Sequence, residues 1–70
     1  MRKRMNCIGI TVRWLREAKG LYQYELAKRC DVTKACICRI ENGEREPSAG
    51  MLVAISKALG CTVDDLLRAG

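Results

Sequence analysis

Turn and capping residues divide this chain of 70 residues into segments that are long enough only for short helices. Gly20, Gly43 and Gly60 each follow a segment with apolar residues three or four positions apart, and glycine is the residue that most often ends a helix. Thr33 and Ser48 stand just before two of these segments, where a hydroxyl can accept a hydrogen bond from a free amide of the first turn. No segment shows the sustained alternation of a strand, so the sequence predicts an all-α fold.

Helical spacing predicts five helices along the chain. We expect helices over about residues 6–19, 23–30, 34–42 and 49–59, and a short fifth helix that follows Thr62 and contains Leu66 and Leu67. Thr62 and Asp65 are three residues apart, which resembles a capping box. Asp31 tolerates the left-handed conformation better than most residues, so it can turn the chain sharply between the second and third helices.

The third and fourth helices each have one side suited to burial. In the third segment this side of a helical wheel holds Thr33, Cys36, Ile37 and Ile40. The opposite side carries small, basic or amide-bearing side chains, namely Lys34, Ala35, Cys38, Arg39 and Asn42. In the fourth segment one side holds Leu52, Ile55, Ser56 and Leu59. A chain of this size buries only about 60% of its unfolded surface, so we expect a small core.

The charge of the chain favours a polyanionic partner. Thirteen Lys and Arg residues against eight Asp and Glu residues give a net charge of +5. Three of the excess positive charges lie in a basic N-terminal arm, residues 1–5, and we treat residues 6–70 as one domain. This distribution favours nucleic acid, although ordinary solubility charge also accounts for a net charge of this size.

The residue types argue against an enzyme and against a bound cofactor or metal. The sequence has no histidine, the commonest general base and metal ligand. Its five cysteines form no Cys-x-x-Cys pair, and an odd number fits a closed set of disulfides poorly. We interpret Cys30 and Cys61 as small core residues. Cys38, on the polar side of the third segment, leaves a redox role open.

Neither secretion nor membrane insertion is indicated by the sequence. The apolar stretch after the basic start is short and interrupted, so it does not resemble a signal peptide. The longest apolar run, Ala49–Ile55, is too short to span a bilayer. We therefore expect a soluble cytoplasmic protein with reduced cysteines.

Two of the expected helices form a unit that points to function. Residues 23–30 and 34–42 are joined by a three-residue turn, which is the layout of a helix-turn-helix. Such a pair cannot bury its own inner faces, so we expect the other helices to cover them and to leave the third helix exposed on one side. An α-helix fits the major groove of B-DNA, where its outer side chains can reach base edges.

An ordered set of motifs gives the chain a family resemblance. Residues 10–67 resemble the lambda-repressor-like, Cro-type (XRE-like) helix-turn-helix DNA-binding family. The resemblance runs through Val12–Arg16, Gln23–Ala27, Ile37–Gly43, Pro47–Ser48, Ala58–Gly60 and Val63–Leu67. It implies a compact five-helix domain that binds double-stranded operator DNA as a homodimer and regulates transcription, and we expect a repressor.

The resemblance also implies which residues contact DNA. Gln23 matches a residue that touches the DNA backbone, and Lys34, Ala35 and Arg39 match positions that face bases. Arg39 and Lys34 can both donate to guanine O6 and N7, and Ala35 can meet a thymine methyl group. The complete candidate DNA-binding set is Gln23, Thr33, Lys34, Ala35, Cys38, Arg39, Asn42 and Arg45.

Other matched positions support this surface or depart from the family. Arg16 and Glu41 match a pair that ties the first helix to the end of the third. Asn42 matches a phosphate contact, and Arg45 lies in a loop that often approaches the backbone. Tyr22 stands where the family often has Ser or Thr at the start of the second helix, which weakens the cap.

Several interpretations stay open. Lys34 and Arg39 also fit a solvated helix face. Trp14 lies off the apolar stripe of the first helix and either covers the edge of the core or marks a contact surface. Candidate dimer contacts are Met51, Val63 and Leu67, of which Leu67 also fits the core. As an alternative function, the same fold acts as an antitoxin or anti-repressor through a protein partner.

Overall fold

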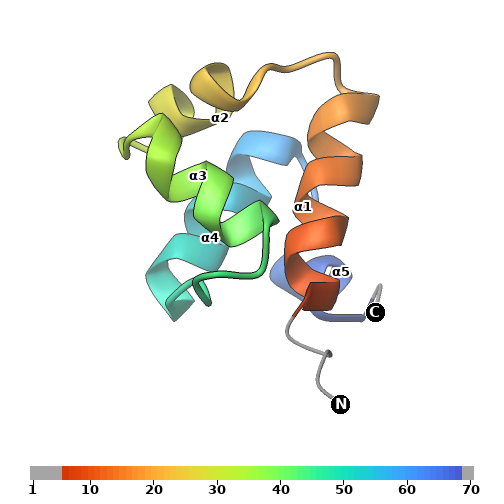
Figure 1. The fold of residues 1–70 in the computed structure, drawn as a ribbon. Helices are drawn as coiled ribbons and strands as arrows, with labels where there is room; N and C mark the ends of the chain where they lie inside the picture. The colour runs from red at the N-terminus through yellow and green to blue at the C-terminus, as the bar shows by residue number, and fades with distance from the viewer. Residues whose placement is uncertain (1–5, 69–70) are drawn as a thin grey trace.

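Five α-helices follow one another in the computed structural model, which describes the backbone of residues 6–68 and the side chains of residues 8–67 (Figure 1). They are α1 (Asn6–Ala18), α2 (Gln23–Arg29), α3 (Lys34–Glu41), α4 (Ala49–Leu59) and α5 (Val63–Arg68). No strand is present among these residues, so the predicted all-α, five-helix fold is confirmed. The basic arm over residues 1–5 lies outside the described residues.

The predicted capping residues make hydrogen bonds at the starts of α3, α4 and α5. Thr33 Oγ1 accepts a hydrogen bond from the amide of Cys36 at 3.2 Å, and Ser48 Oγ accepts one from Met51 at 3.2 Å. The capping box of α5 is reciprocal, because the Thr62 amide donates to Asp65 Oδ2 at 3.1 Å and the Asp65 amide donates to Thr62 Oγ1 at 3.0 Å. Each cap satisfies a backbone amide that has no partner within its helix.

The turn between α2 and α3 depends on one residue in the left-handed region. Asp31 has a φ of 60°, and it is the only residue other than glycine with positive φ among the described residues. The predicted role of Asp31 is therefore confirmed. This sharp turn lets α3 leave α2 at an angle and pack back against it.

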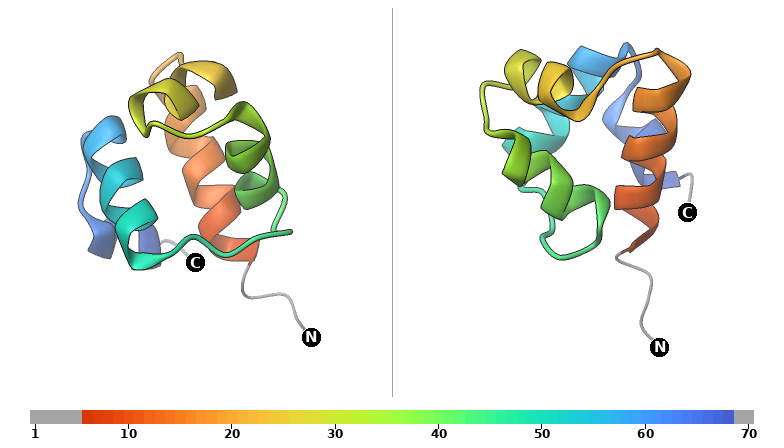
Figure 2. Two further views of the ribbon diagram at one scale, coloured as in Figure 1. Left: turned by 90° about the vertical axis from the view of Figure 1, so that its left-hand side faces the viewer. Right: turned by 45° about the horizontal axis from the view of Figure 1, so that its top comes forward.

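The core lies where the inner faces of the helices meet (Figure 2). Helices α2 and α3 pack on each other, and α1 packs on α3, α4 and α5. In both views of Figure 2, α2 lies at the end of the molecule opposite the start of α1. The fully buried large side chains are Val12, Leu26, Ile37, Ile40, Ile55 and Leu66. Their burial holds the two halves of the helix-turn-helix against the other three helices.

Some predicted core positions are less buried than the wheel suggested. Thr33 is exposed and not on the inner face, because an N-cap residue lies outside the helix and its extended backbone (φ −85°) turns its side chain towards the first turn. Leu52 and Cys61 are half-buried and pack against the edge of the core. Cys30 is buried, which confirms its interpretation as a core residue.

Helix α1 approaches the end of α3 at a glycine. Gly9 is buried, and a Cβ atom placed on it would overlap the carbonyl oxygens of Ile40 and Glu41. No larger residue fits between these two backbones without moving them. The position of Gly9 therefore sets how closely α1 approaches α3.

Candidate nucleic-acid interface

Helix α3 has a buried side and an open side. Ile37, Ile40 and Glu41 are buried against the rest of the domain. The predicted base-facing residues Lys34, Ala35 and Arg39 are all exposed. The interpretation of α3 as a helix with one outward face is therefore confirmed, whereas DNA contact by these side chains stays a prediction.

The remaining candidate residues border this open side. Thr33 and Asn42 are exposed at the two ends of α3, and Arg45 is exposed in the loop that follows. Cys38 is half-buried, and its Sγ accepts a hydrogen bond from Asn42 Nδ2 at 3.5 Å. The fold thus gathers seven of the eight candidates along α3 and the loop after it, within residues 33–45.

The eighth candidate, Gln23, is held by α3 itself. Its Nε2 donates to Glu41 Oε1 at 3.0 Å, and the side chain is half-buried. This bond fixes the start of α2 relative to the end of α3. Sequence reasoning missed it, because two residues 18 positions apart show no local spacing signal.

Glu41 is the centre of a buried polar cluster. Arg16 Nε donates to Glu41 Oε2 at 2.7 Å and Arg16 Nη2 donates to Glu41 Oε1 at 3.1 Å. A third donor of the same guanidinium, Nη1, reaches the carbonyl oxygen of Leu21 at 2.7 Å. The predicted Arg16–Glu41 pair is confirmed, and it joins α1 and the loop before α2 to the end of α3.

The electrostatics of this pair follow from its burial. The side chain of Glu41 is 1% exposed and that of Arg16 is 9% exposed. The hydrogen bond from Arg16 to Glu41 raises the pKa of the Arg16 guanidinium above its ordinary value, against the opposite effect of burial. Two parallel hydrogen bonds fix the direction of the pair as well as its length. The Arg16–Glu41 pair therefore sets the orientation of α3 relative to α1.

Two tyrosines, Tyr22 and Tyr24, stand exposed at the start of α2. Their rings are stacked with centroids 5.8 Å apart and an interplanar angle of 10°. The amide of Tyr22 donates to Glu25 Oε1 at 2.8 Å, while its side chain makes no capping hydrogen bond. Glu25 thus supplies its own half of a capping box, while the half that a Ser or Thr hydroxyl would supply at position 22 is missing, and this confirms the weak cap expected at Tyr22.

Two of the described cysteines have raised pKa values. Burial raises the pKa of the Cys30 thiol, with a smaller contribution from Cys36, and burial likewise raises that of Cys61. Within the described part of the chain, no group of three or more ligating side chains is placed to hold a metal ion. None of the helices described is long and apolar enough to cross a membrane.

The geometry defines a class of protein. Two short helices at a sharp turn, a second helix with an open basic side and three supporting helices are the arrangement of lambda-repressor-like helix-turn-helix domains. The chain belongs to the helix-turn-helix family, whose model matches residues 12–66. Proteins of this family and fold are DNA-binding regulators of transcription.

Solved structures agree with this family. The P22 c2 repressor in complex with a synthetic operator shares 35% identity, with a TM-score of 0.84 over 90% of this chain and 96% of that one. The restriction-modification controller protein C.AhdI from Aeromonas hydrophila shares 29% identity, with a TM-score of 0.86 over 89% of this chain and 94% of that one.

A curated relative is longer than this chain. The competence pilus inhibition repressor of Acinetobacter baylyi is 36% identical over 59 residues, which are 84% of this chain and 54% of that protein. The chain thus spans about half the length of this relative.

Proposed function

We propose that this chain is a sequence-specific DNA-binding repressor of transcription that reads the major groove with α3 as a homodimer. The observation that carries the proposal is the open side of α3, where Lys34, Ala35 and Arg39 are exposed while the opposite side is buried. The Glu41 cluster supports it, because a recognition helix held by hydrogen bonds to two other segments presents its side chains in one fixed orientation.

The side chains on the open face suit base edges. Arg39 can donate two parallel hydrogen bonds to guanine, and Lys34 can donate to the same atoms as a single charged group. Ala35 is small enough to let the helix approach and to contact a thymine methyl group. Asn42, Arg45 and Gln23 border this face and suit contacts with phosphates, which position the protein without reading sequence.

The dimer proposed here places two recognition helices on a roughly palindromic site. Successive half-sites lie about 34 Å apart along one face of B-DNA. Because the α3 helix of each copy then faces the DNA, the two copies contact each other through other surfaces of the domain. Of the candidate contacts, Leu67 is exposed and Met51 and Val63 are half-buried. Relatives that carry the word repressor in their names support the direction of regulation.

Selection of bound DNA from a random pool, at two salt concentrations, tests the proposal. We expect an enriched, two-fold symmetric motif and weaker binding at the higher salt, because each neutralised phosphate releases counterions. Arg39→Ala should cost about 1–3 kcal/mol of binding and relax the preference at one base position of each half-site.

Lys57→Ala is the matched control, since Lys57 is an exposed cation on α4 and its loss removes the same charge without touching α3. The motif should be unchanged in this variant. A pool without an enriched motif, or an Arg39→Ala protein with the wild-type motif, would overturn the proposal. DNA binding that requires a second protein would favour the antitoxin or anti-repressor alternative.

A further inference from the structure

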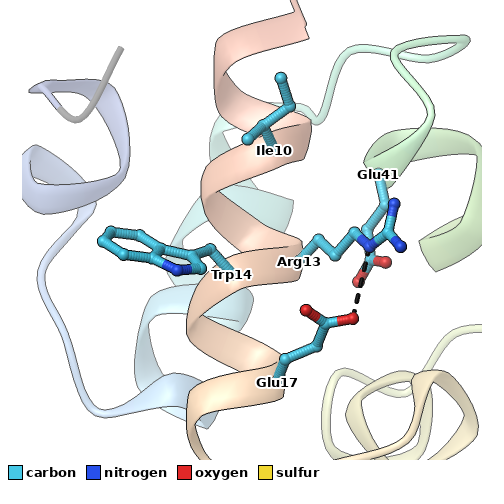
Figure 3. Close-up of a pocket in the computed structure, with 5 residues that line it drawn as sticks. All are labelled: Ile10, Arg13, Trp14, Glu17 and Glu41. Atoms are coloured by element: carbon cyan, nitrogen blue, oxygen red, sulfur yellow. Dashed lines mark hydrogen bonds and ion pairs between the residues drawn. The ribbon is translucent and has the colours of Figure 1, made fainter.

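The outer face of α1 carries two large apolar side chains in solvent. Ile10 is 62% exposed and Trp14 is 69% exposed. Arg13 and Trp14 lie three and four residues after Ile10, and Glu17 lies four and three residues after them, so all four share one face of the helix. Figure 3 shows these four side chains projecting from α1, and we refer to them as the α1 outer face.

The α1 outer face is not the side by which α1 packs against the rest of the domain. The packing side of α1 is a different one, where Gly9, Val12 and Arg16 are buried against the core and the end of α3. A polar residue would serve as well as Ile10 or Trp14 if this face met only water. Two large apolar side chains exposed one helical turn apart on the same face form a small apolar patch, which suits an interaction surface.

The shape of this face suits an incoming side chain. Ile10, Arg13, Trp14, Glu17 and the edge of Glu41 line a shallow cavity of about 260 Å³. At about 30 Å³ for each water in the liquid, this space has room for a side chain the size of several waters. Figure 3 shows Trp14 on one side of α1 and Arg13, Glu17 and Glu41 on the other.

The α1 outer face carries one positive and one negative side chain, so it can be complementary in charge to the same face of a second copy. Arg13 and Glu17 lie one helical turn apart, and their ion pair at 3.4 Å is exposed on both sides, 61% and 55%. Exposed pairs of this kind are weak, so they exchange partners readily. If two copies of α1 face each other antiparallel about a two-fold axis between Arg13 and Glu17, each Arg13 meets the Glu17 of the other copy and the two Trp14 side chains meet each other, because Trp14 lies at the opposite edge of this face from Arg13 and Glu17 (Figure 3). A strongly acidic or basic partner would instead meet one favourable and one unfavourable charge.

We propose that the α1 outer face is an interaction surface that binds the same face of a second copy of this chain. The contact is isologous, because each copy supplies the same apolar pair and the same opposite charges. One helix face is smaller than a standard stable interface, so the association is weak and depends on concentration.

This contact is compatible with DNA binding. None of the four residues of the α1 outer face belongs to α3, and the candidate base-facing residues lie on the side of α3 away from the core. If operator dimers form through α4 and α5, the α1 contact joins two such dimers. This last step rests on the proposed function, whereas the contact itself does not.

Trp14 is the only tryptophan in the sequence, so its fluorescence reports on this face directly. We expect its emission maximum to move to shorter wavelength, and its quenching by acrylamide to fall, as protein concentration rises and sedimentation shows association. Trp14→Gln should weaken association at least about tenfold. Tyr24→Gln is the matched control, because Tyr24 is an exposed aromatic residue on α2, outside α1, α4 and α5, and it should leave association unchanged.

A charge exchange tests whether the partner is a second copy. Arg13→Glu alone places two like charges against each other in both symmetric halves, so it should weaken association by roughly fivefold. The double variant Arg13→Glu/Glu17→Arg restores a complementary face and should recover most of the loss. Circular dichroism and thermal unfolding of each variant check that the helices are kept.

Three outcomes would overturn the proposal. The first is a Trp14 fluorescence that stays constant at every protein concentration at which sedimentation shows association. The second is a Trp14→Gln protein that sediments as the wild-type protein does at every concentration, and the third is a double charge variant that associates no better than Arg13→Glu. Failure to bind DNA while the Trp14 shift persists would instead overturn the proposed function and leave this contact standing.

Discussion

At the scale of single residues, the buried carboxylate of Glu41 accepts hydrogen bonds from Arg16 and Gln23, which come from two other helices. The cost of removing both charges from water is recovered only because the pair is bidentate and the guanidinium also donates to the Leu21 carbonyl oxygen. We infer that Glu41 fixes the direction of α3 more than it adds to the free energy of folding. This distinction can be measured.

Glu41→Ala should destabilise the domain by about 3–5 kcal/mol, because it leaves the Arg16 charge buried without its partner. Gln23→Ala, which removes one neutral donor to the same carboxylate, should cost only about 1 kcal/mol. The apolar double variant Arg16→Met/Glu41→Leu should recover most of the stability. Urea unfolding followed by circular dichroism gives all three values, and a double variant as unstable as Glu41→Ala would contradict this account.

Cys30 makes the stability of the domain sensitive to alkaline pH. Burial raises the pKa of its thiol in the folded state, so the unfolded chain loses the thiol proton first as pH rises. The stabilising effect is complete below the pKa of the unfolded thiol, near 9, and is lost as pH rises through the folded value.

Cys30→Ala should therefore flatten the alkaline fall in the free energy of unfolding, although it lowers stability at neutral pH by leaving a small cavity. Unfolding measured in steps from neutral to strongly alkaline pH under reducing conditions checks the difference between the two proteins. If the free energy of unfolding falls equally with pH in both proteins, the Cys30 thiol does not contribute to the alkaline loss of stability.

At the scale of elements, the contact between α1 and α3 depends on the missing side chain of Gly9. A Cβ there would overlap two carbonyl oxygens of α3, and backbone atoms cannot move aside as a flexible side chain can. Glycine within a helix otherwise costs about 1 kcal/mol relative to alanine. The close approach of the two helices must outweigh this cost.

Gly9→Ala should destabilise the domain in spite of the better helix propensity of alanine. Gly50→Ala is the matched control, since Gly50 lies in α4 and a Cβ added to it would meet nothing within 4 Å, so it should stabilise the domain by up to about 1 kcal/mol. Thermal unfolding of the two variants gives opposite shifts of Tm if the packing argument is right. An upward shift for both would mean that α1 and α3 can separate at no cost.

The helices themselves could be predicted because their signals are local. The glycines with positive φ at Gly20, Gly43 and Gly60, and the hydroxyl caps at Thr33 and Ser48, each act within about one turn of the chain. The predicted bounds agree with the observed helices to within one residue at the ends that were specified. A cap is read from its own residue and the next few, which a sequence contains in full.

The features that escaped prediction depend on residues far apart in the chain. The contact of Gly9 with α3 and the bond from Gln23 to Glu41 both need the folded arrangement before they exist. The open side of α3 was expected from its polar residues, but the exposed position of Thr33 was not, because a wheel treats the N-cap as part of the helix. Which candidate side chains touch DNA stays a prediction, since it depends on a partner as well as on the fold.

At the scale of the whole molecule, the chain separates its tasks between two faces. The open side of α3 is basic and suits a polyanion, while the α1 outer face is apolar with balanced charges and suits another protein surface. The positive charge is not confined to α3, because residues 2–4 of the arm supply three of the cations behind the net charge of +5. DNA affinity should therefore depend on the arm as well as on the recognition helix.

Replacing Arg2, Lys3 and Arg4 with alanine tests this dependence through salt. The arm lies outside the described residues, so the prediction rests on its charge alone. Each phosphate neutralised contributes about 0.9 to the slope of log affinity against log salt, so losing three cations from each copy of a dimer should make the slope shallower by up to about 5. Base preference in the selected motif should be unchanged, because contacts to phosphate carry no sequence information.

The control for the arm variant is Lys19→Ala/Lys57→Ala, which removes two exposed cations away from α3 and should leave the salt slope nearly unchanged. A slope equal to that of the wild-type protein would show that the arm does not meet DNA, and a changed motif would show that it reads bases in the minor groove.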